Sequence, residues 1–380
     1  MDKWRKIRAD YPACKNYVYL ATNGGGPVST PYVQKAQQLL TALSEKGKLV
    51  MPEWGRQVTQ TRTLLADMIQ AKATEIAFIT NTSQAMGLLV GMFPKHYDVL
   101  TMRDEFPTGF VPWMHHGHHI QFVDSNAAGE ISITAIENQI TPATRLLITS
   151  HVLFRTGFRQ DLKAIGALCR KHGLVHIVDA TQSFGVYPID VQEYNIDILI
   201  FHAYKWVTAG YGSGGMYVSK KILDKYPPQV MGWYNVNYPL PDFDTAQDYT
   251  QFTPKEDATV FETGTPPFLN ILLLGEALQY LNGIGIPEIN AYVQTLINYL
   301  HKRAKENNIR VLSDYAAGHL STIQRLAVTP EQYTAIEQHH IAARYKNNML
   351  TIALNFYNNE EDIDTLLAVI KKSAPGISYP

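Results

Sequence analysis

Short apolar runs alternate with helical patterns over the first two thirds of the chain. Leu162, Ile165, Leu168 and Cys169 recur at helical spacing and stop before Gly173, a residue suited to the end of a helix. A second helix is predicted over residues 83–93. Apolar runs predict strands at 76–79, 98–102, 120–123, 145–150, 174–178, 196–201 and 216–219. Continuous apolar strands alternating with helices are typical of a mostly parallel sheet covered on both faces, so the fold class is α/β.

The pattern changes after residue 268. A long amphipathic helical region, 272–281 followed by 286–307, precedes short strands near 309–312, 320–325 and 349–354, and a last helix begins near residue 360. These elements predict a smaller α+β C-terminal domain. We therefore divide the chain into a large domain, 16–265, and a small domain, 266–380, to which residues 1–15 also belong.

Composition excludes several classes of protein. The 380 residues are 46% hydrophobic and 18% charged, which permits a large core and disfavours disorder. The net charge of −1 gives no general attraction to nucleic acid or to a membrane surface. The first residues contain no apolar signal segment, no apolar run is long enough to cross a bilayer, and the two cysteines, Cys14 and Cys169, lack metal-binding spacing. We expect a cytoplasmic protein.

Candidate chemistry is concentrated in residues 176–217. Asp179 ends one predicted strand, Gln182 follows in a turn, and His202, Tyr204 and Lys205 end the next strand. Ligands of α/β sheets bind beyond the carboxyl ends of the strands, so these side chains should surround one crevice. A lysine that is partly desolvated loses basicity and becomes a nucleophile. The simpler alternative for one lysine at a strand end is a side chain that extends to water.

The sequence HIVDATQSFG…DILIFHAYKWVTAGYGSGG closely resembles the pyridoxal 5′-phosphate (PLP) site of aminotransferase class V enzymes, the branch that includes cysteine desulfurases and kynureninases. The resemblance covers nearly the whole chain. It implies PLP-dependent transferase fold type I, with a mostly parallel seven-stranded sheet in the large domain. It also implies that Lys205 forms a Schiff base with PLP and acts in catalysis, while Asp179 keeps the pyridine nitrogen protonated. Asp179 alone would read equally well as a turn cap.

The resemblance further suggests how the cofactor is held. Thr82, Ser83 and Gln84 follow a predicted strand and open a helix, where free N–H groups favour a phosphate, although Thr and Ser are also ordinary helix caps. His202 and Tyr204 occupy positions that supply phosphate donors in the family. Thr265 resembles a residue that reaches the phosphate of the neighbouring subunit, which implies a homodimer with a shared active site.

Two positions match residues near the phenolic oxygen of the cofactor, namely Gln182 and His151. The aromatic ring that stacks on the cofactor is assigned to His115 or His116, although the register around residues 105–107 leaves this open. Four histidines within residues 115–119 also suggest a metal, but no nearby Asp, Glu or Cys supports it, so we predict no metal site. The glycines of 210–215 fit a dinucleotide-binding pattern, but a strand rather than a helix is predicted to follow them, which argues against a dehydrogenase.

The sequence departs from the family pattern in two ways, and each limits the reactions and substrates that we expect. No cysteine follows Cys169, whereas desulfurases carry a catalytic cysteine on a mobile loop in the C-terminal half. Thr351 stands where relatives that use α-amino acids usually place a carboxylate-binding arginine. Either another arginine binds the carboxylate, with Arg155 preferred over Arg344 and Arg325, or the substrate is not a simple α-amino acid. Asn23, near the start of the resemblance, is a further substrate-binding candidate.

We therefore predict a PLP-dependent enzyme that acts on a small-molecule amino compound, as a class V aminotransferase or a lyase. A kynureninase-like hydrolase is the enzymatic alternative. The alternative from another class is a non-catalytic PLP-binding or interaction protein on the same fold. The sequence does not distinguish amino-group transfer from elimination, because both pass through the same chemistry at the substrate carbon next to the nitrogen.

Overall fold

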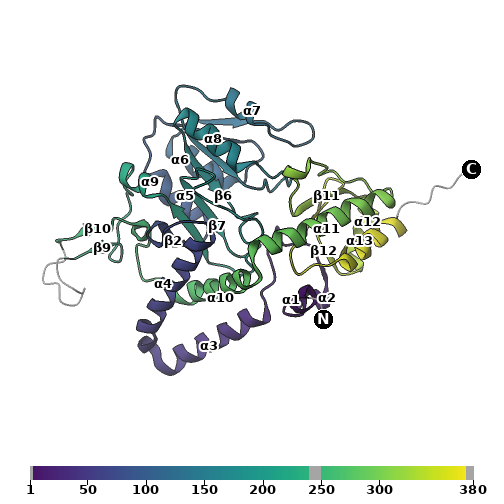
Figure 1. The fold of residues 1–380 in the computed structure, drawn as a ribbon, viewed down its shortest axis with the longest axis horizontal. Helices are drawn as coiled ribbons and strands as arrows, with labels where there is room; N and C mark the ends of the chain where they lie inside the picture. Colours follow the sequence, from purple (N-terminus) through teal and green to yellow (C-terminus); the bar gives the residue numbers. More distant parts are fainter. Residues whose placement is uncertain (1–2, 239–249, 374–380) are drawn as a thin grey trace, which may run out of the picture.

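A computed structural model describes residues 3–238 and 250–373. A β-sheet that includes β2, β6 and β7 forms its centre (Figure 1). Seven strands make up this sheet, in the order β2-β8-β7-β6-β5-β3-β4. Strand β8 is antiparallel to both of its neighbours, and the other pairs are parallel. The mostly parallel seven-stranded sheet is therefore confirmed. Its strands are β2 (Ile76–Ile79), β3 (Asp98–Met102), β4 (Ile120–Val123), β5 (Thr144–Ser150), β6 (Val175–Asp179), β7 (Ile198–His202) and β8 (Gly214–Val218).

Neighbouring residues of each central strand enter two different cores. In β7, Ile198 and Ile200 pack in the core on one face of the sheet, whereas Leu199 and Phe201 pack in the core on the other. Because successive side chains of a strand point to opposite faces, a strand buried on both faces must be apolar at every position. This explains the unbroken apolar runs in the sequence. Helices on the two faces include α5 (Thr82–Val90), α6 (Val111–His116), α7 (Ile133–Asn138), α8 (Leu162–His172) and α9 (Lys220–Lys225).

The helix predicted to stop before Gly173 does end there. Helix α8 begins after Asp161, whose Oδ1 accepts a hydrogen bond from the N–H of Ala164 at 2.9 Å, and it ends at Gly173, with φ of 66°. Only glycine adopts that left-handed conformation without strain. The glycines of 210–215 lead directly into β8, so the argument against a dinucleotide site is confirmed.

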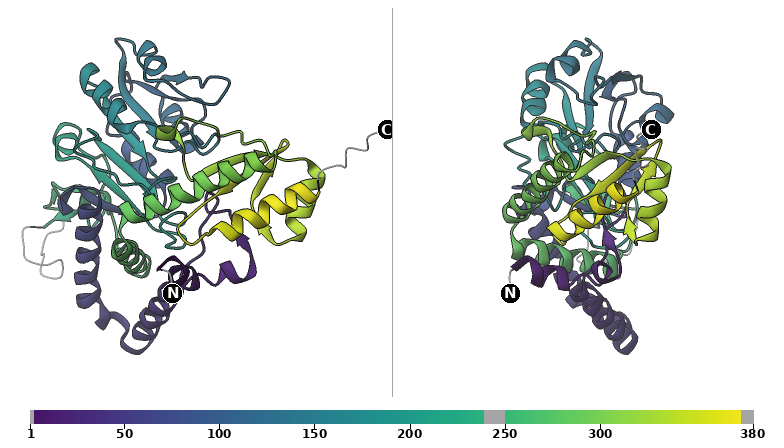
Figure 2. Two further views of the ribbon diagram at one scale, coloured as in Figure 1. Left: turned by 45° about the vertical axis from the view of Figure 1, so that its right-hand side comes forward. Right: turned by 90° about the vertical axis from the view of Figure 1, so that its right-hand side faces the viewer.

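Helices α3 (Thr30–Lys46) and α4 (Met51–Met68) were not predicted from the sequence. They form an arm that projects from the body of the molecule, and α10 (Phe268–Ile284) packs against both (Figure 2). Helix α10 begins the sequence-predicted small domain, yet it packs on helices of the large domain. The boundary at residue 265 stays a prediction.

The C-terminal part contains a three-stranded antiparallel sheet with the order β11-β14-β13. The predicted strand at 309–312 is wrong, because only a single bridge joins Val311 to Leu326. Strands β13 and β14 are joined by Asn347 and Asn348, with φ of 51° and 56°. Two consecutive left-handed residues make the tightest common hairpin turn. The elements here are α11 (Ile286–Glu306), β11 (Ile323–Ala327), α12 (Pro330–Gln338), β12 (Ile341–Ala342), β13 (Arg344–Lys346), β14 (Met349–Ala353) and α13 (Glu360–Lys372).

The N-terminal segment lies against this C-terminal part. Arg8 forms a two-pronged ion pair with Asp362 of α13, with both N–O distances at 2.8 Å, and β1 pairs in parallel with β12. The remaining short elements are α1 (Lys3–Ala9), α2 (Ala13–Asn16), β1 (Val18–Tyr19), β9 (Val236–Asn237) and β10 (Thr253–Pro254).

Within residues 3–238 and 250–373, no single helix is both long and apolar enough to cross a membrane. Helices α10 and α11 meet the length and composition criteria only when taken together, as a pair bent by 73°.

Candidate active site

A cavity of about 140 Å³ lies where the sheet strands end. Its lining comes from the segments that follow β2, β3, β5, β6 and β7, which all end at the same edge because these strands run in the same direction. The lining residues are Asn81, Thr82, Ser83, Phe106, Thr108, Ser150, Phe154, Asp179, Thr181, Gln182, His202, Tyr204 and Lys205. Seven residues assigned from the sequence therefore meet here: Thr82, Ser83, Asp179, Gln182, His202, Tyr204 and Lys205.

Lys205 and Asp179 are both buried in the wall of this cavity. Burial lowers the pKa of the Lys205 ammonium to about 8, and the nearby Asp179 carboxylate opposes that shift. Burial also raises the pKa of Asp179, whose Oδ1 accepts a hydrogen bond from the Thr181 N–H at 2.8 Å. A lysine with this lowered pKa has a usable population of neutral amine near neutral pH. It can therefore act as a nucleophile toward a carbonyl and as a base.

One side of the cavity is built from hydrogen-bond donors that suit a phosphate. Helix α5 begins there, with Asn81 as its cap, and the Thr82 and Ser83 hydroxyls lie at its first turn. Free backbone N–H groups at a helix start attract anions. Across the cavity, Nε2 of His202 is buried without a hydrogen-bond partner among the described residues. An unpaired buried polar atom beside donors at a helix start fits a bound anionic group.

His202 is neutral at physiological pH, because burial and the nearby Lys205 lower its pKa to about 4. Its ring packs edge-on against Tyr204, with 4.3 Å between ring centroids, and Tyr204 stacks on Tyr211 at 5.0 Å. The two rings assigned to phosphate binding thus support each other.

Gln182 is held in a fixed orientation. Its Oε1 accepts a hydrogen bond from Nε1 of Trp206 at 3.0 Å, and its Nε2 donates to the backbone oxygen of Asn23 at 3.2 Å. Asn23 therefore lies next to the site but contacts it through its backbone. His151 is buried one layer behind the cavity, where burial and Arg159 lower its pKa to about 3. Its ring contacts Tyr187 edge-on instead of lining the cavity.

The ring that the segment after β3 contributes to the cavity is Phe106, and not His115 or His116. Phe106 lines the cavity and packs edge-on against Phe154, with ring centroids 5.2 Å apart, whereas His115 and His116 lie at the end of α6 and do not line it. The assignment of the stacking ring to His115 or His116 is therefore wrong. Pro107 begins a short 3₁₀ turn that sets the register, so the first residue after Glu105 faces the cavity.

Four further residues assigned from the sequence do not line the cavity. Gln84 folds back, and its Oε1 accepts hydrogen bonds from the N–H and hydroxyl of Thr80. Thr265 is exposed. Arg155 is also exposed, with its Nε 3.3 Å from Oδ1 of Asp104. Arg344 lies in β13, directly opposite Thr351 of β14.

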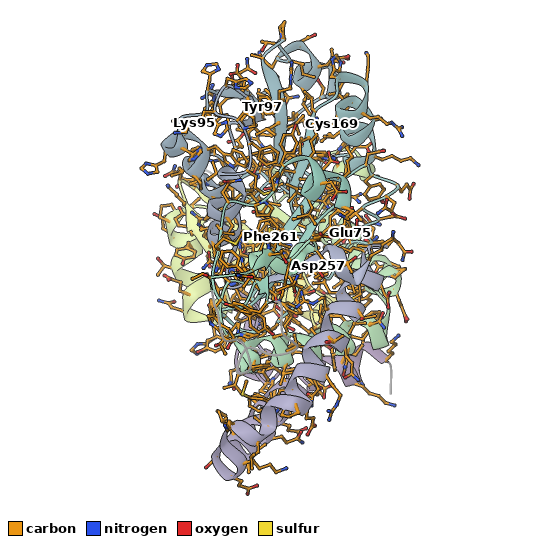
Figure 3. All side chains as sticks on the ribbon, turned by 90° about the vertical axis from the view of Figure 1, so that its left-hand side faces the viewer. Glu75, Lys95, Tyr97, Cys169, Asp257 and Phe261 are labelled. Atoms are coloured by element: carbon orange, nitrogen blue, oxygen red, sulfur yellow. The ribbon has the colours of Figure 1, made fainter. Side chains whose placement is uncertain are left out.

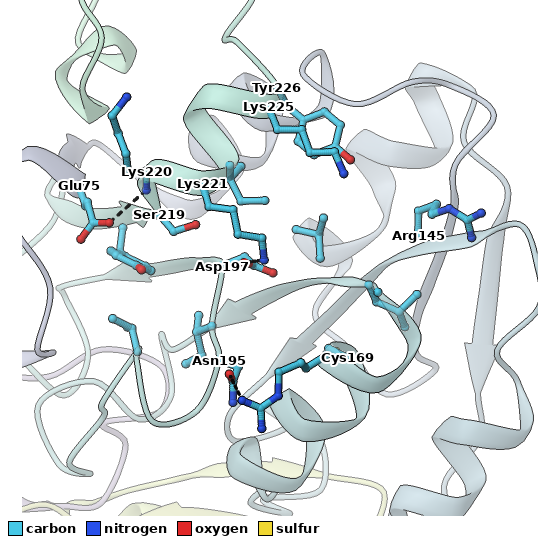
Figure 4. A pocket seen from close by; sticks show the side chains of 18 of the residues that line it. Glu75, Arg145, Cys169, Asn195, Asp197, Ser219, Lys220, Lys221, Lys225 and Tyr226 are labelled. Atoms are coloured by element: carbon cyan, nitrogen blue, oxygen red, sulfur yellow. Dashed lines mark hydrogen bonds and ion pairs between the residues drawn. The ribbon is translucent and has the colours of Figure 1, made fainter.

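A larger cleft, of about 610 Å³, lies elsewhere on the sheet, where β6 and β7 begin. Figure 3 looks onto the face of the molecule that carries Glu75 and Cys169, two residues of this cleft. Figure 4 shows two of its polar contacts: Lys221 pairs with Asp197 at 3.0 Å, and Glu75 accepts a hydrogen bond from the Lys220 N–H at 3.0 Å. Among the described residues, the lining of this cleft has no buried lysine like Lys205.

The histidines near residue 116 form no metal centre in the part of the chain that the structure describes. His116 stacks on His118 with 5.6 Å between ring centroids, and no group of three or more His, Cys, Asp or Glu residues there has metal-binding geometry.

Known proteins of this architecture bear on the site. The profile of the aminotransferase class-V family matches residues 18–366. The chain belongs to this family. It is 26% identical to an uncharacterised aminotransferase of Bacillus subtilis, over 94% of this chain and 95% of that protein. It is 25% identical to a probable cysteine desulfurase of Methanothermobacter thermautotrophicus, over 97% of each chain.

Two solved structures share the fold along nearly the whole length. An apo cysteine desulfurase from Thermococcus onnurineus superposes with a TM-score of 0.86 at 20% identity and covers 98% of each chain. The cystine C–S lyase C-DES, solved with its product cysteine persulfide, superposes with a TM-score of 0.85 at 22% identity, over 96% of this chain and 100% of that one. Fold type I is confirmed.

As a class V aminotransferase family member, the protein is a PLP-dependent enzyme. The cavity fits that cofactor, because it combines a buried lysine, a buried carboxylate, an aromatic ring and donors at a helix start. The relatives named above are an aminotransferase, desulfurases and a lyase, so they lend no support to a kynureninase-like hydrolase.

Proposed function

We propose that this enzyme uses PLP to eliminate a group from a small amino acid, or to transfer its amino group, without a protein thiol. The observation that carries the proposal is Lys205, buried beside Asp179 in the cavity with its pKa lowered to about 8. PLP, when bound, supplies an electron sink for negative charge at the substrate carbon next to the nitrogen.

The proposed roles follow from where each group lies. Lys205 attaches the cofactor through its amine and, once released by substrate, moves a proton at that carbon. Asp179 keeps a proton on the ring nitrogen, Phe106 covers the ring, and Gln182 faces the phenolic oxygen. The phosphate is held by the start of α5 together with His202 and Tyr204. These roles are supported by the shared cavity and by the unpaired Nε2 of His202.

A persulfide mechanism is not part of the proposal. Both cysteines of the chain lie outside the cavity: Cys169 lines the far cleft, and Cys14 precedes β1. Burial raises the pKa of the Cys14 thiol to about 11, which disfavours the reactive thiolate. Reactions that need only proton transfer by Lys205 remain, and C–S elimination and amino-group transfer are both of this kind.

Arg344 is the guanidinium that we propose for the substrate carboxylate. It lies opposite Thr351, the position that by resemblance corresponds to the family's usual carboxylate-binding arginine, and Arg325 is the cross-strand neighbour on the other side. Arg325 is partly used, since its Nη2 donates to the Tyr315 hydroxyl at 2.8 Å, and Arg155 pairs with Asp104. Arg344 forms no ion pair among residues 3–238 and 250–373.

We also propose that the enzyme is a homodimer with a shared active site. The exposed position of Thr265 supports this, because the family places that residue at the phosphate of the neighbouring subunit. Tyr211, which stacks on Tyr204 at the cavity, is 76% exposed, which is unusual for so large an aromatic side chain and suits a partner surface.

The proposal is tested with the purified enzyme, reconstituted with PLP, while amino acids are added one at a time. We expect the visible absorbance of the cofactor to shift with the substrate class, and we expect pyruvate and ammonia from an elimination or a keto acid from a transfer. An enzyme that binds no PLP, or that changes absorbance with no amino acid, contradicts the proposal. Release of sulfide from cysteine, or of cysteine persulfide from cystine, would select elimination.

The carboxylate assignment has a matched pair of variants. Arg344→Ala should raise the KM for the substrate by roughly tenfold to a hundredfold, because a charge-assisted, two-pronged contact is lost. Arg155→Ala should change KM little, since Arg155 is paired at the surface. The reverse pattern would assign the carboxylate to Arg155.

A further inference from the structure

Glu105 is a buried acid directly behind the cavity, and it follows the end of β3. It is only 4% exposed. Its carboxylate accepts hydrogen bonds from the backbone N–H and hydroxyl of Ser150, from the N–H of Phe106 at 3.3 Å and from the hydroxyl of Thr149 at 3.4 Å. None of the ion pairs among residues 3–238 and 250–373 includes Glu105. A buried carboxylate held only by neutral donors is uncommon, and its free-energy cost calls for a compensating role.

Two of the residues that donate to Glu105 belong to the cavity itself. Phe106 supplies the aromatic ring, and Ser150 is the direct neighbour of Asp179 in the parallel pairing of β5 with β6. Glu105 thereby joins the segment that carries the ring to the strand end beside the catalytic acid. The edge-on contact with Phe154 then limits the rotation of the Phe106 ring.

The charge of Glu105 also reaches the cofactor site. The pKa of Glu105 is raised to about 7. Burial is the largest cause and the negative charge of Asp179 adds to it, whereas the donors from Ser150 and Phe106 oppose the shift. Lys205 lies in the segment after β7 and interacts with Asp179, and the imidazole of His151 next to Ser150 is neutral near pH 7. Asp179 is therefore the charged group that interacts with Glu105 most directly.

We propose that Glu105 is a positioning residue of the PLP site, which fixes the Phe106 ring over the cofactor by tying its backbone to Ser150. The proposal rests on the assignment of this cavity to PLP. Phe106 is 47% exposed and follows a loop, so packing alone holds it weakly. The hydrogen bonds to Glu105 supply the missing constraint.

Glu105→Gln is the sharpest variant, because the amide has the same size and presents N–H groups to donors. One buried donor then loses its acceptor. We expect the affinity of the apoenzyme for PLP to fall roughly tenfold to a hundredfold, the scale of one unsatisfied buried group. The visible circular dichroism of the bound cofactor should also change, because the ring next to it is no longer fixed.

Glu75→Gln is the matched control. Glu75 is a second buried glutamate that accepts backbone hydrogen bonds, from Lys220 at 3.0 Å and Lys72 at 3.1 Å, but it does so in the far cleft. We expect this variant to lower Tm while leaving PLP affinity and the circular dichroism unchanged. A loss of Tm common to both variants, with wild-type PLP affinity and spectrum in Glu105→Gln, overturns the proposal.

A double-mutant cycle tests whether Glu105 affects PLP affinity through the Phe106 ring. Because Glu105 acts through Phe106, Glu105→Gln should have little further effect on PLP affinity in a Phe106→Ala background. Full additivity overturns the proposal. If Glu105→Gln does not fold, Ser150→Ala removes one donor to Glu105 and tests the same link, and unchanged affinity and spectrum count against it. Wild-type protein that binds no PLP refutes the proposed function, whereas wild-type binding with an unaffected variant refutes only this inference.

Discussion

The cofactor cavity and the far cleft use the same sheet and similar residues, yet they differ in how their charges are satisfied. The cleft is the larger hollow, about 610 Å³ against about 140 Å³. Lys220 and Lys221 of the cleft form ion pairs with Asp224 and Asp197. Lys205 forms no ion pair among the described residues and lies buried near Asp179 and His202, whose Nε2 has no partner there. A buried lysine beside a buried carboxylate, and not volume, therefore marks the end of the sheet where we propose that the chemistry takes place.

The largest expected effect concerns Lys205. Lys205→Ala should lower kcat by about three orders of magnitude or more and abolish covalent attachment of PLP, because the nucleophile and the proton carrier are lost together. Borohydride trapping followed by mass spectrometry measures the attachment. PLP fixed to another lysine of the wild-type enzyme would contradict the assignment and remove the contrast between the two ends of the sheet.

Asp179→Asn should lower kcat by roughly two orders of magnitude, the scale of one preorganised electrostatic partner. The amide keeps the shape of the side chain but cannot hold a positive charge on the ring nitrogen. PLP binding should persist, so steady-state kinetics at saturating cofactor separate this loss from a loss of affinity. An active Asp179→Asn enzyme would show that ring protonation is not needed.

The pH dependence of PLP capture tests the lowered pKa of Lys205. Only the neutral amine attacks, so the capture rate of the apoenzyme should rise as pH approaches 8 and level off above it, in accord with a pKa of about 8. Between pH 8 and the ordinary lysine pKa of 10.5, the unfolded chain binds more protons than the folded one, so this group makes the fold more stable as pH rises. Stopped-flow absorbance measures the rate. A midpoint near 10.5 would show a solvated lysine.

The smallest effect on the cofactor is expected from Asp197→Asn in the far cleft. Asp197 is a buried acid that accepts hydrogen bonds from the His176 N–H and from Lys221, so its loss should cost about 1–3 kcal/mol of stability. PLP affinity should stay unchanged. Thermal unfolding and cofactor titration, run beside Asp179→Asn, measure both. Weaker PLP binding here would mean that the two ends of the sheet are coupled.

The sequence predicts the parts of the site that follow directly from a strand. Asp179, His202 and Lys205 end apolar runs, and parallel strands bring such ends together, so their meeting needs no knowledge of loops. Phe106 and Glu105 were missed, because which of them faces the cavity depends on the 3₁₀ turn that begins at Pro107. Glu105 is also stabilised by Ser150, 45 residues away, and local pattern carries no signal of such a contact.

Other differences between the sequence predictions and the structure also arise from features that a local sequence pattern does not show. Arg155 is preferred from the sequence because it follows a strand near His151, but its ion pair with Asp104 takes it away from the cavity. Helix α3 carries exposed apolar residues, including Leu40 at 56% and Leu43 at 38% exposure, and such positions obscure the amphipathic pattern of the helix.

The turn at Asn347 and Asn348 limits how far any side chain in this connection can travel. Two residues span at most roughly 7 Å even when fully extended, and here both are fixed by the pairing of Lys346 with Met349. No swinging arm can therefore leave from this point to carry a reactive fragment between the cavity and another molecule.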